Sequence, residues 1–258
     1  RRPAVASPFR PELIMRPTPQ AAQQHARASA DYADKLARSR ALLSASLNDF
    51  SPLKQASSLG AEDVVITHLI NALRLDIPVF VLDTGALHNE TLALLERTQA
   101  YSRTRIEVYR PHHESVIRWV RERGQDAIYR SIDERKACCE VRKLEPLRHA
   151  LQGQRAWITG LRREQSTNRG SVEMIDKSEL TTQGRIKLNP LADWTWGDVW
   201  HYIATEGVDY NPLHDEFFPS IGCAPCTRAI SLGEDFRAGR WWWEDETATE
   251  CGLHATHS

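Results

Sequence analysis

Apolar and polar residues follow one another along the chain in blocks that fit strands and helices in turn. Short runs that are apolar or rich in strand-favouring residues predict strands at residues 53–58, 77–82, 106–109 and 156–161. Elsewhere the apolar positions recur at close to 3.6-residue spacing, as they do from Val65 to Leu73. Patterns of this kind predict helices at residues 62–73, 89–101, 113–123 and 141–151. Residues 21–50, which are rich in Ala, Leu, Arg and Gln and lack internal Pro or Gly, also predict a helix.

The alternation of strands and helices indicates the class of fold. Several predicted strands are continuous apolar runs, which suits strands that are covered on both faces. The sequence therefore predicts an α/β fold, a parallel sheet with helices on both faces. Ligands of such sheets bind beyond the carboxyl ends of the strands, so the loops of interest are residues 57–63, 83–88 and 160–169.

The two ends of the chain differ from its middle. Residues 1–19 hold five of the 13 prolines, which predicts an extended or disordered segment. From Trp194 onward the pattern is less regular, and this part holds six of the eight tryptophans and three of the five cysteines. We therefore expect a disordered segment at residues 1–19, a main domain at residues 20–236 and a mobile C-terminal segment at residues 237–258.

Charge and composition argue against several classes of protein. The chain has 33 Lys and Arg against 34 Asp and Glu, and a formal net charge of −1 disfavours a nucleic-acid binder or a membrane-surface protein. No run of about 18 apolar residues is present, which disfavours a membrane-spanning helix. Because the first residues lack the apolar core of a secretory signal, we expect a cytoplasmic location.

Four of the five cysteines form two close pairs. Cys138 and Cys139 are adjacent, and Cys223 and Cys226 form a CxxC motif. Four thiolates suit a Zn²⁺ ion or an iron–sulfur cluster. Adjacent cysteines reach different irons of a [4Fe–4S] cluster more readily than they converge on one small ion, which favours the cluster. Two alternatives stay open: a zinc site, or a buried Cys138–Cys139 pair with a redox disulfide in the CxxC motif.

The fifth cysteine, Cys251, is the eighth residue from the end and lies in the motif ECGLH. A cysteine on a mobile tail can act as a nucleophile that is delivered to a site, and the alternative is a surface thiol without a role. His254 is placed to assist ionisation of the thiol, but four acidic residues precede Cys251, and like charge disfavours a thiolate. We expect Cys251 to become a good thiolate only when it is docked against a cationic pocket.

Seven segments of the chain carry a family resemblance: SSLGAED (57–63), LDTG (82–85), CCEVRKLEPL (138–147), GLRREQSTNR (160–169), KLNPLADWT (187–195), GCAPC (222–226) and ECGLH (250–254). Together and in this order they resemble the assimilatory adenylyl-sulfate (APS) reductases, the iron–sulfur branch of the sulfonucleotide reductases. The resemblance covers nearly the whole chain from about Leu53 to His254. It implies a Rossmann-like sheet of the adenine nucleotide alpha-hydrolase type.

The resemblance also implies a reaction and its partners. Cys138, Cys139, Cys223 and Cys226 would hold a [4Fe–4S] cluster, and Cys251 would attack the sulfur of APS to form an S-sulfocysteine. A separate thioredoxin would then release sulfite, for sulfate assimilation and cysteine biosynthesis. Family members that use the 3′-phosphorylated substrate, PAPS, generally lack both cysteine pairs, so APS is the implied substrate. The oligomeric state stays open, a homo-oligomer included.

The cationic residues that match the family are assigned to the phosphosulfate group: Lys143, Arg237, Arg240 and His254. Lys143 follows Cys139 by four residues, which on one helix places it near both the cluster and the sulfate. The alternative for Arg237 and Arg240 is a solvated basic face. The run Trp241–Trp243 would cover the site or, as the pattern favours, form a packed aromatic cluster.

Residues of the three strand-end loops complete the predicted substrate site. Arg162, Arg163 and Arg169 are candidate phosphate ligands, with surface ion pairing as the alternative for at least one of them. The AMP phosphate or ribose is assigned to Ser57, Ser58 and Gly60. Asp83, Thr84 and Gly85 would shape the nucleotide pocket, with a plain strand-end turn as the alternative.

Two other classes of protein compete with the reductase. ATP pyrophosphatases, such as the enzymes that thiolate tRNA, share the fold, but their phosphate loop reads SGGxDS and is richer in glycine than residues 57–63. A zinc-stabilised nucleotide-binding regulator without catalysis is the second alternative. It predicts a colourless protein that forms no covalent adduct.

Overall fold

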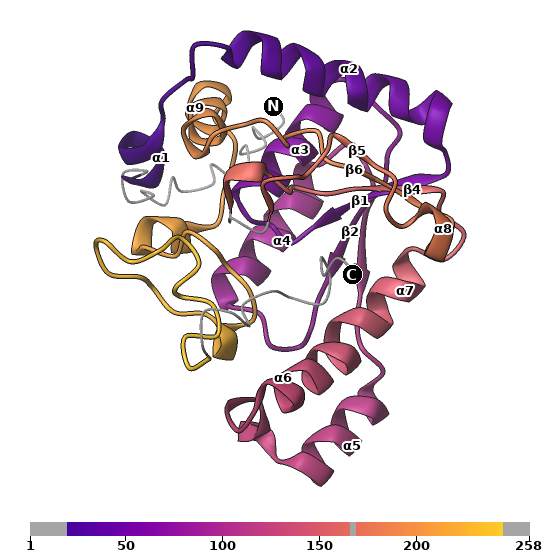
Figure 1. Cartoon of the computed structure of the whole chain (residues 1–258), viewed down its shortest axis with the longest axis vertical. Coiled ribbons are helices and arrows are strands. Elements are labelled where there is room, and N and C mark those ends of the chain that lie inside the picture. The colour runs from indigo at the N-terminus through magenta and orange to yellow at the C-terminus, as the bar shows by residue number, and fades with distance from the viewer. Residues whose placement is uncertain (1–19, 166–168, 245–258) are drawn as a thin grey trace, which may run out of the picture.

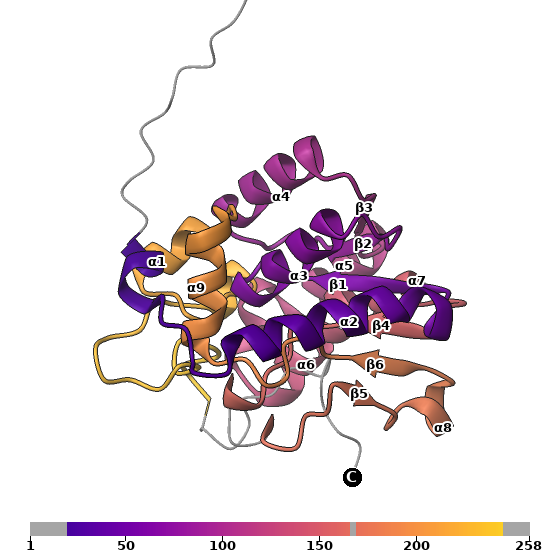
Figure 2. The same cartoon turned by 90° about the horizontal axis from the view of Figure 1, so that it is seen from above.

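The structure, a computed structural model, describes residues 20–165 and 169–244 and is centred on a six-stranded sheet (Figures 1 and 2). The strands lie in the order β3-β2-β1-β4-β6-β5. All neighbouring strands run parallel except β5, which pairs antiparallel with β6 at the edge. Their bounds are Leu53–Ser57 (β1), Val79–Leu82 (β2), Ile106–Tyr109 (β3), Ala156–Ile158 (β4), Ile175–Asp176 (β5) and Ile186–Leu188 (β6). The predicted parallel α/β sheet is confirmed, with an antiparallel edge strand in addition.

The described helices lie before, between and after these strands in the chain. They are Gln20–His25 (α1), Tyr32–Phe50 (α2), Ala61–Ala72 (α3), Asn89–Tyr101 (α4), His113–Arg123 (α5), Ile132–Cys139 (α6), Glu145–Ala150 (α7), Leu180–Gln183 (α8) and Trp196–Glu206 (α9). A π-helical segment, Glu140–Leu144, joins α6 to α7, and 3₁₀ turns lie at Gln125–Tyr129, Arg163–Gln165, Pro212–Glu216 and Ala224–Cys226. Of the helices described, none is long and apolar enough to span a bilayer.

Successive residues of the strands pack against opposite layers of helices, because side chains alternate across a strand. Val81 and Ile158 belong to the main core, with buried residues of α2, α3 and α9. Their neighbours Phe80 and Trp157 lie on the other face and pack with Ala150 at the end of α7. In Figure 1, α3 and α7 accordingly lie on opposite sides of the strands.

The predicted bounds are confirmed for three elements: the helices at residues 89–101 and 113–123 and the strand at residues 106–109. The predicted helix at 141–151 is the second half of a longer helical run that begins at Ile132. The predicted helix at 21–50 is wrong in one respect, because residues 26–31 separate α1 from α2.

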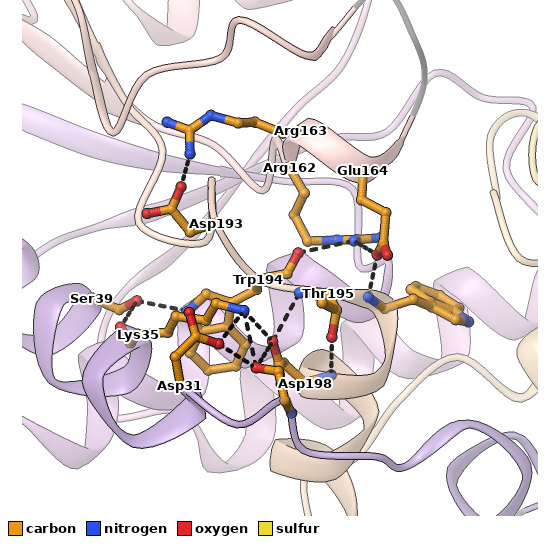
Figure 3. Close-up of polar contacts among 12 residues, drawn as sticks. Asp31, Lys35, Ser39, Arg162, Arg163, Glu164, Asp193, Trp194, Thr195 and Asp198 are labelled. Atoms are coloured by element: carbon orange, nitrogen blue, oxygen red, sulfur yellow. Dashed lines mark hydrogen bonds and ion pairs between the residues drawn. The ribbon is translucent and has the colours of Figure 1, made fainter.

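The interruption of that helix has a tertiary cause. The N–H and Oγ of Ser29 donate to the two carboxylate oxygens of Asp198 (2.7 and 3.0 Å) at the start of α9. Asp198 is fully buried and also accepts from Nζ of Lys35 (3.1 Å) and from the N–H of Thr195 (2.9 Å) (Figure 3). The backbone at 26–31 therefore leaves the helix to supply donors to a buried carboxylate.

Candidate active site

A cavity of about 210 Å³ lies beyond the carboxyl ends of β1, β2 and β4. Parallel sheets of this kind bind ligands at this edge, because loops from several strands converge there. The segment around Cys223 closes the cavity from a distant part of the sequence. The structure thus brings together eight of the predicted substrate residues: Ser57, Ser58, Gly60, Thr84, Lys143, Arg169, Arg237 and Arg240.

A tight loop leads from β1 into α3 at this cavity. Leu59 has a positive φ of 61°, and its N–H donates to Oγ of Ser57 (3.2 Å). Ser58 donates from its N–H and its Oγ to Oδ2 of Asp63 (2.6 and 2.7 Å), which ties the loop to the first turn of the helix. Gly60 is the N-cap and has no side chain with which to cap the helix. The N–H groups at the start of α3 therefore suit a phosphate.

Glu62 and Arg162 join this loop to the loop after β4. Nε of Arg162 lies 2.9 Å from Oε1 of Glu62, and the Arg162 side chain is 1% exposed. Nε2 of Gln165 donates to the same Glu62 oxygen (3.0 Å) and to the carbonyl of Gly160 (3.2 Å). Burial is the largest influence and opposes ionisation of Glu62, but the Arg162 charge and the hydrogen bonds from Gln165, Arg162 and the backbone together lower the pKa of Glu62. The pair is therefore ionised and holds the two loops together.

Gly160 permits the close approach of these loops. A Cβ atom at this position would lie 2.5 Å from Oδ1 of Asp63 and 2.8 Å from Cβ of Glu62. We expect Gly160→Ala to lower the free energy of unfolding by about 1–3 kcal/mol, because the start of α3 must shift. Urea unfolding of the ligand-free protein measures the loss.

Gly60→Ala is the matched control for this prediction. Its Cβ would meet only Oγ of Ser58, at 3.4 Å, so we expect a loss below about 1 kcal/mol from the poorer N-cap. Equal losses for the two variants would contradict the steric role of Gly160.

Four predicted substrate residues, Arg162, Arg163, Asp83 and Gly85, are not among the residues that line the strand-end cavity. Arg162 is buried and paired with Glu62, with Glu164 (2.9 Å) and with the carbonyl of Trp194 (3.2 Å), as Figure 3 shows in part. The partner of Arg163 is Asp193 (Figure 3), and that of Asp83 is Arg110 (2.9 Å). Gly85 lines a neighbouring cavity. Because neighbouring carboxylates neutralise Arg162 and Arg163, these two side chains bind protein groups rather than a phosphate.

Arg240 is held in the cavity wall by the segment that precedes the CxxC motif. Its Nη1 donates to the carbonyl of Ile221 (3.2 Å) and approaches Oγ of Ser220 (3.4 Å). A Cβ on residue 222 would lie 2.5 Å from Nη2 of Arg240, so Gly222 provides the space for the guanidinium. The side chain is nearly buried, which strengthens its field on any anion in the cavity.

A second cavity, of about 270 Å³, shares Lys143 and Cys223 with the first. All four paired cysteines, Cys138, Cys139, Cys223 and Cys226, line it as free thiols. Among the described residues, no three His, Cys, Asp or Glu side chains are grouped to hold a single metal ion. The two cysteine pairs, 84 or more residues apart in the sequence, nevertheless meet at one cavity next to the strand-end site.

Burial dominates the electrostatics of two of these thiols, Cys138 and Cys226. It raises the pKa of Cys138, against the opposing charge of Arg142, and raises the pKa of Cys226 to about 11. Oγ1 of Thr84 lies 3.2 Å from Sγ of Cys223. Without a metal, Cys138 and Cys226 therefore keep their protons at neutral pH, and a metal centre that binds there must displace them.

The helix of the tandem cysteines changes its winding beside the site. Cys138 and Cys139 end α6, and the next five residues form the π-helical segment. This segment carries Arg142, whose Nη1 donates to the carbonyl of Thr84 (2.8 Å), and Lys143, which lines both cavities. Single π-helical turns are frequent at functional sites, because they re-aim side chains without ending the helix.

Several residues that line the strand-end cavity were absent from the predicted site: Glu62, Asp63, Thr91, Gln165, His214 and Phe236. Three of them, Glu62, Asp63 and Gln165, lie within the segments 57–63 and 160–169 and had a signal in the sequence. His214 and Thr91 had none, because their place in the cavity depends on how distant segments pack.

His214 is expected to make the protein less stable as the pH falls. The ring is buried, Nδ1 lies 2.8 Å from the carbonyl of Phe218, and Nε2 has no partner among the described residues. Burial lowers the pKa of His214 to about 4. Since an unfolded chain takes up this proton near pH 6.5, its contribution to the free energy of unfolding falls by up to about 3 kcal/mol between about pH 6.5 and pH 4.

Urea unfolding of the wild type and of His214→Asn at pH values across this range tests the prediction. The variant keeps a donor for Phe218 but cannot take up the proton. We expect its stability to depend less steeply on pH, and parallel curves for the two proteins would show that His214 is not responsible.

Of the last part of the chain, the structure describes the segment up to Glu244, which packs against the cysteine site. Trp241 is buried in a cluster with Cys223 and Cys226, and Trp243 packs against the same cluster. This arrangement matches the packed aromatic cluster that the sequence favours. Cys251 and His254 lie outside the described residues, as does the predicted disordered segment at residues 1–19.

Comparison with known proteins identifies the family. Residues 52–229, more than half of the chain, match the phosphoadenosine phosphosulfate reductase domain. The chain belongs to the phosphoadenosine phosphosulfate reductase family. A relative from Allochromatium vinosum named adenosine 5′-phosphosulfate reductase is 52% identical over 213 residues, 83% of this chain and 82% of that protein. Another of the same name, from Burkholderia cepacia, is 47% identical over 226 residues, 88% of this chain and 90% of that protein.

Solved structures support the phosphoadenosine phosphosulfate reductase fold. A phosphoadenylyl-sulfate reductase from Candida auris, in a phosphate complex, has a TM-score of 0.63 and 25% identity, and the match covers 79% of this chain and 98% of that chain. The FMN adenylyltransferase of Candida glabrata has a TM-score of 0.55 at 13% identity, over 90% of this chain and 79% of that chain, and shares the fold alone. The predicted adenine nucleotide alpha-hydrolase type of fold is thus confirmed.

Proposed function

We propose that this protein reduces adenosine 5′-phosphosulfate to sulfite and AMP. The observation that carries the proposal is the junction of two cavities, because the one lined by four cysteines shares Lys143 and Cys223 with the cationic one at the strand ends. Both relatives described above are named for this activity. The activity would serve sulfate assimilation and cysteine biosynthesis in the cytoplasm.

Charge neutralisation is the main task of the described residues. The sulfur of APS is shielded by anionic oxygens, and an attacking thiolate is also an anion. Lys143, Arg169, Arg237 and Arg240 line the cavity and would lower this repulsion by binding the phosphosulfate oxygens. The N–H groups at the start of α3 would bind the AMP phosphate.

The first chemical step would be made by Cys251. Its thiolate attacks the sulfur of the bound phosphosulfate, a bond forms between Sγ and that sulfur, and the bond from sulfur to the AMP phosphate oxygen breaks. AMP leaves with the electron pair, and Cys251 carries an S-sulfo group. His254 is proposed to assist at the same site.

A separate thioredoxin would complete the reaction. One of its thiolates attacks Sγ of Cys251, and sulfite leaves with the electron pair of the broken S–S bond. The second thioredoxin thiol then resolves the mixed disulfide, so thioredoxin is oxidised by two electrons and the thiol of Cys251 is restored.

Cys138, Cys139, Cys223 and Cys226 would hold a [4Fe–4S] cluster. The fit rests on the donor set, since four thiols and no other soft ligands line one cavity beside Arg142 and Lys143. When bound, the cluster would order the cysteine region and add to the field at the sulfate. It need not change its oxidation state, because thioredoxin supplies both electrons.

Intact mass spectrometry tests the proposed function. Protein mixed with APS in the absence of thioredoxin should gain the mass of one SO₃ group on Cys251, and reduced thioredoxin should remove it with release of sulfite. PAPS in a parallel sample should react more slowly. Release of sulfite without any adduct would refute the covalent mechanism, and a colourless preparation that contains zinc would refute the cluster.

A further inference from the structure

The last described residues are fastened to the cysteine site. The N–H of Trp241 donates to the carbonyl of Cys226 (3.2 Å), and the N–H of Glu244 donates to the carbonyl of Trp241 (2.8 Å). An isolated β-bridge also pairs Thr227 with Arg240. The chain therefore reaches Glu244 along the CxxC motif, and the predicted nucleophile Cys251 follows seven residues later.

A buried ion pair joins this segment to the helix of the tandem cysteines. Nε and Nη2 of Arg135, in α6, donate to the two carboxylate oxygens of Glu244 (2.6 and 2.9 Å). The two side chains are 1% and 3% exposed. Arg135 precedes Cys138 by three residues, so it lies one helical turn from the tandem cysteines. A two-pronged pair of this kind fixes the orientation as well as the distance of its partners.

Trp241 connects the pair to the substrate cavity. The guanidinium carbon of Arg135 lies 4.4 Å from the centre of the Trp241 ring, and that of Arg240 lies 4.7 Å from it. Trp241 itself is buried. A series of contacts therefore runs from the wall of the substrate cavity to the end of the described chain. It passes from Arg240 to Trp241, then to Arg135 and then to Glu244.

We propose that Arg135, Trp241 and Glu244 form an anchor that sets the point from which Cys251 reaches the substrate, with Arg135 and Glu244 as positioning residues. The inference rests on the proposed role of Cys251. Seven residues span at most about 25 Å, so the place where Glu244 is held limits the volume that Cys251 can search. Apolar residues of similar volume often replace a buried ion pair without loss of stability. We therefore infer that the Arg135–Glu244 pair serves to fix the geometry of the segment.

The experiment compares the rate of adduct formation with the integrity of the sites. Iron-loaded Glu244→Gln and Arg135→Lys proteins are mixed with saturating APS, quenched at intervals, and analysed by intact mass. Both changes remove the ionic fork, and Arg135→Lys keeps its positive charge. We expect the rate to fall by about 10- to 100-fold, because small displacements of a reacting group have effects of this size. The dissociation constant of AMP and the iron content should stay within about twofold of the wild type.

Glu234→Gln is the matched control. It removes a two-pronged ion pair with Arg228 (2.7 and 2.8 Å) in the same part of the chain, but this pair is local and partly exposed. We expect its adduct rate to equal that of the wild type. Hydrogen exchange at the Trp241 amide adds a measurement that does not depend on the reaction, and it should be faster in both anchor variants than in this control.

The possible outcomes separate the anchor from the proposed function. Wild-type rates in both anchor variants would overturn the anchor and leave the function intact. Parallel loss of iron and AMP binding would also overturn it, because Arg135 and Glu244 would then be structural. Unchanged exchange at Trp241 would show that the pair does not hold the segment. Absence of an adduct in the wild type would overturn the function, and the anchor with it.

Discussion

Replacing Cys251 by serine is expected to abolish the covalent adduct and lower the rate of sulfite formation by at least about a thousandfold. A serine hydroxyl is a far weaker nucleophile at neutral pH, and thioredoxin cannot form a disulfide with its oxygen. The iron content and the affinity for AMP should not change, because the proposed cluster ligands are the other four cysteines and the proposed AMP ligands belong to the strand-end cavity. Steady-state sulfite assays, intact mass and iron analysis measure the three effects.

The same substitution at Cys226 is the matched control. Cys226 is buried and lines the cysteine cavity, so Cys226→Ser should lose iron and visible colour together with activity. The two serine variants are therefore expected to separate the nucleophile from the cluster ligands. Normal turnover of APS by Cys251→Ser would exclude Cys251 as the nucleophile.

Removal of the Arg162 side chain is expected to be the most damaging change to stability. Arg162→Ala leaves the buried carboxylate of Glu62 without its main countercharge and deletes the bond to the carbonyl of Trp194. Breaking a buried ion pair in this way costs about 3–5 kcal/mol, and we expect the free energy of unfolding to fall by that amount. Urea unfolding at neutral pH gives the value.

Arg148→Ala serves as the matched control for Arg162→Ala. Arg148 also pairs with a glutamate, Glu140, but its side chain is 58% exposed. Exposed pairs contribute about 0–1 kcal/mol, so the same change should have little effect there. Similar losses at the two positions would show that burial of Glu62 and Arg162 is not what makes their pair important. In the Arg162 variant AMP should also bind more weakly, because the loop before α3 is no longer held.

The pair of Glu62 and Arg162 also shows which features of the site sequence analysis could predict and which it could not. Sequence analysis located the loops after the strands, because apolar runs mark the strands and the ligand edge follows from their parallel order. It could not tell which arginine of a loop faces a ligand and which faces a carboxylate. Arg162 and Arg169 stand in the same segment, yet one is buried against Glu62 and the other lines the cavity.

In the fold, too, elements with a local sequence pattern were predicted, and elements that depend on distant contacts were missed. Helices such as 89–101 were predicted with their bounds because their apolar periodicity is local. The short strands β5 and β6 were missed, because two or three residues carry too little pattern and their pairing is long-range. The break before α2 was missed for a similar reason, since Asp198 acts on Ser29 from 169 residues away.

What the sequence determined by itself was the order of strands and helices, the strand-end location of the loops, and a set of paired cysteines with cationic neighbours. These features are encoded locally, by periodicity and by residue chemistry. Only the tertiary structure decided which charges meet. It buried Arg162 against Glu62 and Arg135 against Glu244, and it brought Cys138 and Cys226 to one cavity, because contacts between distant segments are selected by packing and charge compensation in the folded chain.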